Sequence, residues 1–293
     1  LEPFRKQRLD YIKEYAGDRY GDNGTQHATP YNLINLYVSI LSRRLAPTNP
    51  RAFVQTFDST LKPTANSFEL AVNRKIEDIH LGTTLGKFVI EALFGMGIIK
   101  TGLNLSGTVE VGGIDHDTSE PFAEIIEFED FVWDLTAKTY EQVQFVGNRF
   151  SMTAEDIFES GIFDEEALEK LAKHIKGGGQ NDRDTVETAN NLVADDINNE
   201  EVFKKRINLW DVWLPAENKV ITFMDDDSSF ALRVIDYEGP ENGPYELLRF
   251  NEVPGNIMPV PPVSTLYKLH RLTNKLMTKV AMQGDRQKTV GLV

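Results

Sequence analysis

The sequence predicts an α+β protein whose last long element is a helix. Apolar residues recur at helical spacing over roughly the first hundred residues and then alternate with a period of two. The chain then returns to helical spacing between a double proline and a glycine. Because the helices come before the strands, a repeating βαβ arrangement is not expected, and we predict helices followed by an antiparallel or mixed sheet region.

Composition limits the classes of function. The 293 residues carry a formal net charge of −14 and include no cysteine. With 41% hydrophobic residues, the chain can bury a sizeable core, as one large domain or as a domain with an extension. An acidic monomer is not expected to bind nucleic acid over a broad surface, and the lack of cysteine excludes disulfides and thiolate metal sites. No run of about eighteen apolar residues is present, so no membrane contact is predicted.

Helical spacing predicts four helices in the first third of the chain. The first is interpreted as a surface arm, whereas the second carries apolar residues on more than one face and is predicted to be buried. Residues 51–57 alternate between two prolines and predict a strand. The four predicted helices cover residues 5–15, 31–45, 64–79 and 83–99.

The period changes to that of strands from residue 102 onward. Short turns between the last strands predict that strands adjacent in sequence pair with one another. Thr153 and Asp164 are predicted to begin short helices. Residues 176–200, rich in Gly, Asn and Asp, are predicted to be a mobile loop or an insertion. The predicted strands cover residues 107–111, 123–128, 142–150, 201–215, 219–224, 229–237 and 245–250.

The final helix has the clearest sequence boundaries. Pro262 disfavours helix before it, Ser264 is a good N-cap and Gly284 is a good residue to follow the last turn. We therefore predict a helix over residues 265–283, about 28 Å long. A stripe of apolar residues at steps of three and four predicts that one side of it packs. The stripe consists of Leu266, Leu269, Leu272, Leu276 and Val280.

A second stripe on this helix is cationic. Residues 264–288 contain six Lys or Arg and one Asp, a balance of +5, which leaves −19 for the rest of the chain. The stripe is either the solvated face of an amphipathic helix, or a surface that meets an acidic neighbouring subunit or a nucleic-acid backbone. The helix has no Trp or Phe to anchor it at a membrane surface. The candidate site residues are Lys268, Arg271, Lys275 and Lys279.

Motifs for catalysis or metal binding are weak. The segment from Gly82 to Phe88 is one residue too short for a phosphate-binding loop and places Phe88 where Ser or Thr is needed. Residues 115–117, Asp-His-Asp, are predicted to be a solvated turn, and the five histidines have no metal-binding spacing. The carboxylates between Glu124 and Asp134 support one alternative, a metal-dependent hydrolase. Otherwise we predict no enzymatic activity, no metal and no cofactor.

Several segments resemble tailed-bacteriophage portal proteins, the head-tail connector family. The first is Tyr31-Asn32-Leu33-Ile34 with residues 41–45, and the second runs from Phe128 to Asp134 and on to residues 153–157. The third is the helix that follows Pro262-Val263-Ser264, with the exit Gln283-Gly284-Asp285-Arg286. The order of the predicted elements is similar to that of the family over most of the chain.

The resemblance implies a portal-like organisation. Residues 1–250 would form the wing domain, 251–285 a linker and the first stem helix, and 286–293 the start of the clip domain. The rest of the clip, the second stem helix and the crown would lie outside this sequence.

The resemblance also implies a role and a set of partners. The chain would form a homo-oligomeric ring, expected to be a dodecamer, at one capsid vertex of the virion, after assembly in the host cytoplasm. Double-stranded DNA would pass through the ring during packaging and ejection. The ring would contact the major capsid protein, the terminase and the head-tail adaptor. The four cations would be divided between subunit contacts and the DNA channel. Another virion connector or structural protein is the alternative within the same class.

Overall fold

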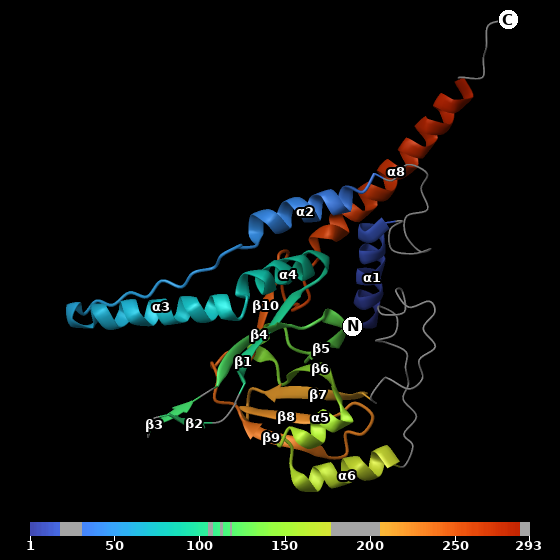
Figure 1. The fold of residues 1–293 in the computed structure, drawn as a ribbon. Coiled ribbons are helices and arrows are strands. Elements are labelled where there is room, and N and C mark those ends of the chain that lie inside the picture. The colour runs from blue at the N-terminus through green and yellow to red at the C-terminus, as the bar shows by residue number, and fades with distance from the viewer. Residues whose placement is uncertain (18–30, 105–107, 112–113, 118, 177–205, 288–293) are drawn as a thin grey trace, which may run out of the picture. The chain divides into compact units, whose positions relative to one another are not determined.

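The computed structural model describes the chain apart from residues 18–30, 105–107, 112–113, 118, 177–205 and 288–293 (Figure 1). Residues 177–200 of the predicted mobile loop lie outside the described residues. The fold is α+β, as predicted. It divides into two compact units. Unit 1 contains Leu1–Phe128, Pro244–Pro254 and Met258–Val293, and unit 2 contains Glu129–Gly243 and Gly255–Ile257. Within the described part, no helix is long and apolar enough to cross a membrane.

Unit 1 is organised around a helical cluster. Its helices are α1 (Glu2–Ala16), α2 (Leu33–Leu45), α3 (Lys62–Asp78), α4 (Leu81–Phe94) and α8 (Pro262–Gln287) (Figure 1). Ile34 of α2, Leu93 of α4 and Val263 of α8 are fully buried in one apolar cluster, which Tyr11 of α1 also joins. Four helices from distant parts of the sequence therefore share one core.

The first helix does not form the predicted surface arm. Arg8 and Tyr11 are buried, and Arg8 forms an ion pair with Glu91 of α4. The Tyr11 ring also packs edge-on against Tyr267 of α8, with 5.0 Å between the ring centroids. The prediction was wrong because the helical spacing of α1 does not reveal which partner helix its apolar side meets.

The second helix is buried on one side only. Ile34 and Val38 are buried, whereas Leu36, Ile40 and Leu45 are exposed. The prediction of a buried helix was therefore wrong. The helix begins later than predicted because Asn32 is its N-cap and accepts a hydrogen bond from the Asn35 N–H at 2.9 Å.

Two glycines shape α4 and the strand after it. A Cβ on Gly82, at the start of the helix, would lie 2.7 Å from the Thr48 carbonyl oxygen, so Gly82 allows a close approach. The predicted helix over residues 83–99 ends at Phe94, and β1 (Gly97–Asn104) follows. A Cβ on Gly97 would lie 2.6 Å from the Phe88 carbonyl oxygen, because the strand folds back tightly onto the helix.

Unit 1 also contains two antiparallel sheets. β1 lies between β4 (Glu120–Ile125) and β10 (Tyr245–Leu248). The last strand therefore pairs with the first and not with its neighbour in sequence, which corrects the predicted hairpin order. β2 (Thr108–Val111) and β3 (Ile114–Asp117) form a separate hairpin, so residues 115–117 lie in a strand and not in the predicted turn.

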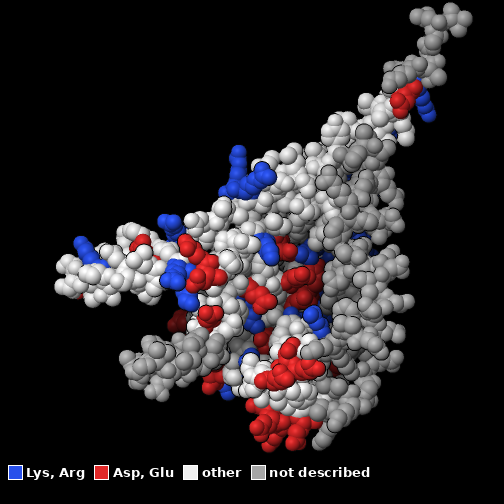
Figure 2. All heavy atoms as spheres, viewed as in Figure 1, with Lys and Arg blue, Asp and Glu red and all other residues white. Residues whose placement is uncertain are grey.

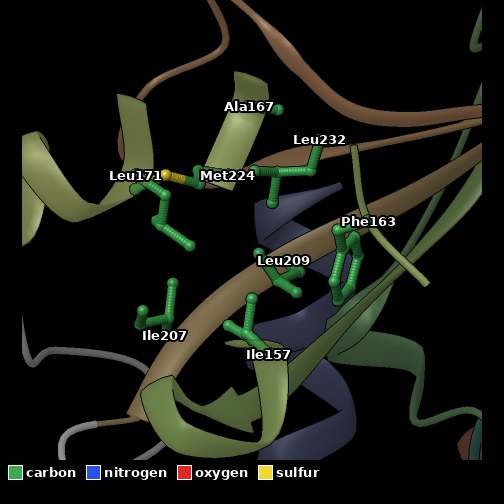
Figure 3. Close-up of a cluster of buried hydrophobic side chains, with 8 residues drawn as sticks. All are labelled: Ile157, Phe163, Ala167, Leu171, Ile207, Leu209, Met224 and Leu232. Carbon is green, nitrogen blue, oxygen red and sulfur yellow. The ribbon is translucent and has the colours of Figure 1, made fainter. Parts of the chain in front are cut away.

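Unit 2 is a five-stranded antiparallel sheet with two helices against it. The strand order is β5 (Phe131–Trp133), β6 (Val146–Thr153), β7 (Arg206–Leu214), β8 (Lys219–Met224) and β9 (Ala231–Asp236). Alternate residues of β7 are buried, which places Ile207 and Leu209 on the face toward α5 (Ala154–Glu159) and α6 (Glu165–Lys176) (Figure 3). The pairing of β7, β8 and β9 confirms the predicted succession of neighbouring strands.

Short 3₁₀ turns occur in both units. They cover Ser59–Leu61, Phe128–Asp130 and Tyr140–Gln142.

The final helix is longer than predicted at both ends. α8 covers Pro262–Gln287, about 39 Å at 1.5 Å per residue. Pro262 occupies the first turn, where its fixed φ and missing N–H are tolerated. Ser264 is not the N-cap, because its hydroxyl lies inside the helix and donates to the Pro261 carbonyl oxygen at 2.6 Å. Gly284 does not end the helix, and residues 286–287 of the predicted clip belong to α8.

Candidate functional site

The candidate site is α8, which presents three different faces. Successive residues of an α-helix are rotated by about 100°, so its stripes can be assigned from spacing and burial. The first face carries the buried side chains of Val263, His270 and Asn274. The second carries the four predicted cations. The third carries four apolar side chains that are between 53% and 61% exposed, namely Leu269, Leu272, Leu276 and Val280.

The predicted packing side of α8 is therefore not the side that packs within the chain. Of the five residues in the predicted stripe, only Leu266 packs against the core of unit 1. The other four have their apolar side chains exposed to solvent in the isolated chain. The four follow one another at steps of three and four, so they form a continuous apolar strip beside the cationic one.

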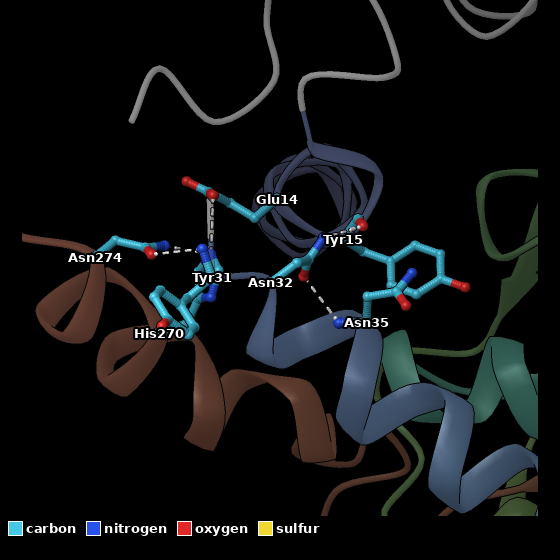
Figure 4. Close-up of polar contacts among 7 residues, drawn as sticks. All are labelled: Glu14, Tyr15, Tyr31, Asn32, Asn35, His270 and Asn274. Carbon is cyan, nitrogen blue, oxygen red and sulfur yellow. Dashed lines mark hydrogen bonds and ion pairs between the residues drawn. The ribbon is translucent and has the colours of Figure 1, made fainter. Parts of the chain in front are cut away.

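A polar cluster holds the buried face of α8 against the start of the chain (Figure 4). The Asn274 side-chain oxygen accepts the Tyr31 N–H at 3.3 Å, and its nitrogen lies 3.2 Å from His270 Nε2. Glu14 of α1 places a carboxylate oxygen 3.3 Å from the same His270 nitrogen. The amide N–H can donate only to a bare Nε2, whereas donation to Glu14 needs a hydrogen on Nε2, so the two contacts belong to different hydrogen positions on the His270 ring. These polar contacts, and not apolar packing, hold this part of α8 against Glu14 and Tyr31.

Asn32 continues this network from α8 to the helices beside it (Figure 4). Its side-chain nitrogen donates to the Tyr15 carbonyl oxygen at the end of α1, at 2.7 Å, while its oxygen caps α2. The sequence analysis missed these anchoring residues. Isolated His, Asn and Glu residues carry no spacing signal, since their partners lie up to 256 positions away in the sequence.

The cationic face of α8 borders a groove against α1. The groove has a volume of about 580 Å³, and its lining includes Gln7, Tyr11, Lys268, Arg271 and Lys275. The Arg271 guanidinium lies over the Tyr267 ring, 5.8 Å from its centroid, in a cation–π contact. Burial raises the pKa of Tyr11, and the nearby Tyr267 adds to this effect, so the Tyr11 hydroxyl stays neutral.

The structure brings together three of the four predicted cations. Lys268, Arg271 and Lys275 line the groove, whereas Lys279 lies one turn further along the same face and is not among the lining residues. All four are exposed. Within the described part of the chain, none of them forms an ion pair. Their positive charge is therefore available to an anionic partner.

The carboxylates from Glu124 to Asp134 are divided between the two units. Glu124 lies on β4 in unit 1, opposite Lys100 in the strand register, whereas Asp130 and Asp134 belong to unit 2. Asp130 binds Arg149, with a carboxylate oxygen 2.8 Å from its Nε. Among the residues that the structure describes, no group of three or more His, Asp or Glu could hold a metal ion.

Asp134 has a structural role that gives a test by pH. Its carboxylate accepts hydrogen bonds from the Thr136 hydroxyl at 2.6 Å and the Thr136 N–H at 2.9 Å, and these lower its pKa below the ordinary 3.8. Its stabilising contribution is thus present above pH 3.8 and is lost as the pH falls through the lowered pKa. We expect Asp134→Asn to lower the free energy of unfolding at pH 7 and to flatten its decline in acid.

This prediction is tested by measuring the free energy of unfolding in urea between pH 2 and 7, with Asp226→Asn as the control variant. The Asp226 side chain is exposed. An Asp134→Asn curve parallel to that of the wild type would contradict the assigned role.

Comparison of the sequence with protein-family models and with curated proteins finds no match.

Proposed function

We propose that this chain is the subunit of a bacteriophage portal ring, in which α8 is the first stem helix. The ring would be a dodecamer at one capsid vertex, a conduit for double-stranded DNA during packaging and ejection. It would be built in the host cytoplasm and would dock the major capsid protein, the terminase and the head-tail adaptor. The subunit itself would carry no catalytic activity, and the energy for packaging would come from a partner motor.

The observation that carries this proposal is the exposed apolar strip on α8. A strip of four aliphatic side chains on one helix face is unfavourable in water and is typical of a surface that another protein covers. In a closed ring, each subunit uses one surface against the preceding neighbour and a different one against the next. The strip formed by Leu269, Leu272, Leu276 and Val280 would pack against the stem of an adjacent subunit.

The cationic stripe beside this strip supports the same arrangement. Outside residues 264–288, the chain carries −19, so an adjacent copy is strongly acidic. The basic groove along Lys268, Arg271 and Lys275 can accept carboxylates of that copy, while Lys279 lies beyond the groove. Cations that are not used at the interface would face the DNA in the channel, and the acidic remainder would keep the duplex from adhering to the walls.

Charge reversal on the stripe tests this proposal. We expect Lys275→Glu combined with Lys279→Glu to shift most subunits out of the ring or to reduce DNA packaging, because like charges placed opposite each other cost several kcal/mol in an interface. Ring content is measured by native mass and negative-stain imaging, and packaging by the DNA content of heads.

The matched control is Lys138→Glu combined with Arg206→Glu, which changes the net charge equally at exposed positions of unit 2. Rings and packaging that survive reversal on α8 as well as they survive the control changes would argue against the assigned role of the stripe.

A further inference from the structure

A second unpartnered surface lies on unit 1, on the segment we call the arm (residues 51–78). The arm consists of the extended residues 51–58, a 3₁₀ turn and α3, and it runs away from α1 and α8 (Figure 1). None of its described side chains is buried. Residues 51–57 were predicted to form a strand, but they are extended without pairing to any described strand.

The arm nevertheless has a defined structure, held by hydrogen bonds. Asn73 of α3 accepts the Ala52 N–H at 2.8 Å and donates to the Ala52 carbonyl oxygen at 3.0 Å. Glu69 accepts the Val54 N–H at 3.2 Å. Asp58 caps the turn by accepting from the Thr60 N–H at 2.9 Å. Polar side chains of α3 therefore hold the extended segment in a fixed register.

The outer face of the arm is aromatic. The half-buried residues Ala52 and Val54 alternate with exposed ones, so Phe53 and Phe57 face away from α3. Phe57 is fully exposed, and the exposed fraction of Phe53 is 75%. On α3, Phe68 and Leu70 are 60% and 73% exposed. In proteins, most of the stability of a helix comes from tertiary packing of its apolar residues, so such an arm is expected to pack against another surface.

The same unit offers a surface that fits this arm. The outer side of α2 exposes Leu36 and Ile40, which are four residues apart and lie on one face. Figure 2 shows Lys and Arg side chains over the end of α2 that leads into the arm, and the sequence places Arg43 and Arg44 there. Neither arginine forms an ion pair with a described residue. α2 contains no acidic residue at all.

Charge indicates which partner covers the arm. Two copies that each carry −14 repel each other wherever their acidic surfaces meet, such as over α5 and α6 (Figure 2). The arm contains four Lys or Arg and four Asp or Glu, a net charge of zero. The arm is neutral and aromatic, whereas the outer side of α2 is basic and aliphatic. Because neither surface is acidic, two acidic copies can approach each other there. Aromatic side chains are also those that most often dominate binding energy at interfaces.

We propose that the arm of one subunit lies across α2 of the adjacent copy of this chain. This inference rests on the proposed ring, because the contact joins two different surfaces and so continues from subunit to subunit. Phe53, Phe57 and Phe68 anchor the arm, and Leu36 and Ile40 receive it. The contact is separate from the one along α8, so the ring has two zones of adhesion.

The absence of cysteine allows a clean cross-linking test on the full-length protein. The double variant Leu36→Cys with Leu70→Cys, treated with a short bismaleimide, is expected to give a ladder of covalent oligomers on a denaturing gel. A mixture of the two single variants is expected to give dimers and no longer species. The pair Leu36→Cys with Leu135→Cys, which joins α2 to an exposed leucine of unit 2, is the control and is expected to stay monomeric.

A second variant measures the strength of the contact. Phe53→Ser combined with Phe57→Ser is expected to raise the concentration needed for half-assembly by about tenfold or more, with an unchanged far-ultraviolet circular dichroism spectrum. The arm contact would be overturned if rings form, the double-cysteine variant gives no ladder and the Phe variant assembles unchanged. The ring proposal would then still stand. If the wild type forms no ring and the double-cysteine variant gives no ladder, both proposals fail. A ladder without rings would uphold the contact and reject the portal ring.

Discussion

Leu272→Glu combined with Leu276→Glu is expected to convert the proposed ring into folded monomers. Both leucines are exposed in the isolated chain, so the subunit tolerates the new carboxylates. In the assembled ring the same positions would be buried between adjacent stems, where an unpaired charge costs several kcal/mol. The change is measured as loss of the ring in native mass, with the circular dichroism spectrum and melting temperature of the monomer as the check on folding.

Leu135→Glu combined with Ile162→Glu is the matched control for this double change. Both are exposed aliphatic residues of unit 2, away from both stripes of α8, and the control adds the same charge. The control is expected to retain rings. If both variants assemble equally well, the apolar strip is not an interface.

Leu93→Ala is expected to lower the free energy of unfolding of unit 1 by about 2–5 kcal/mol. Leu93 is fully buried on α4, in the cluster that contains Val263 of α8. The loss combines the missing apolar contact with the cavity left behind, because the surrounding helices relax only in part. Denaturant unfolding followed by circular dichroism measures the change.

Leu103→Ala provides the comparison, since Leu103 is exposed on β1 in the same unit. It is expected to change the free energy of unfolding by less than about 0.5 kcal/mol. Equal losses in the two variants would show that the cluster around Leu93 does not limit the stability of unit 1.

Local signals in the sequence predicted much of the secondary structure. The strand predicted over residues 219–224 coincides with β8. Thr153 caps α5 as its spacing to Asp156 suggested, with its hydroxyl oxygen accepting the Asp156 N–H at 3.2 Å. Such signals depend on neighbours within a few positions, which is why they could be identified without knowledge of the tertiary structure.

Pairings between distant segments could not be predicted. β10 pairs with β1 across about 150 residues, and no local pattern favours this pairing over one with β9. The faces of α8 show the same limit. Its leucines have the more regular spacing, yet the chain buries His270 and Asn274, which contact Glu14 and the Tyr31 backbone. The cationic stripe was found from its spacing, but its groove with Tyr11 was not.

The native mass of the purified full-length protein, measured by mass photometry with negative-stain images of the same sample, tests the central claim most directly. The proposed function predicts a ring of about a dozen subunits with a central hole, joined by heterologous contacts. A protein that remains a monomer or dimer at every concentration would contradict it.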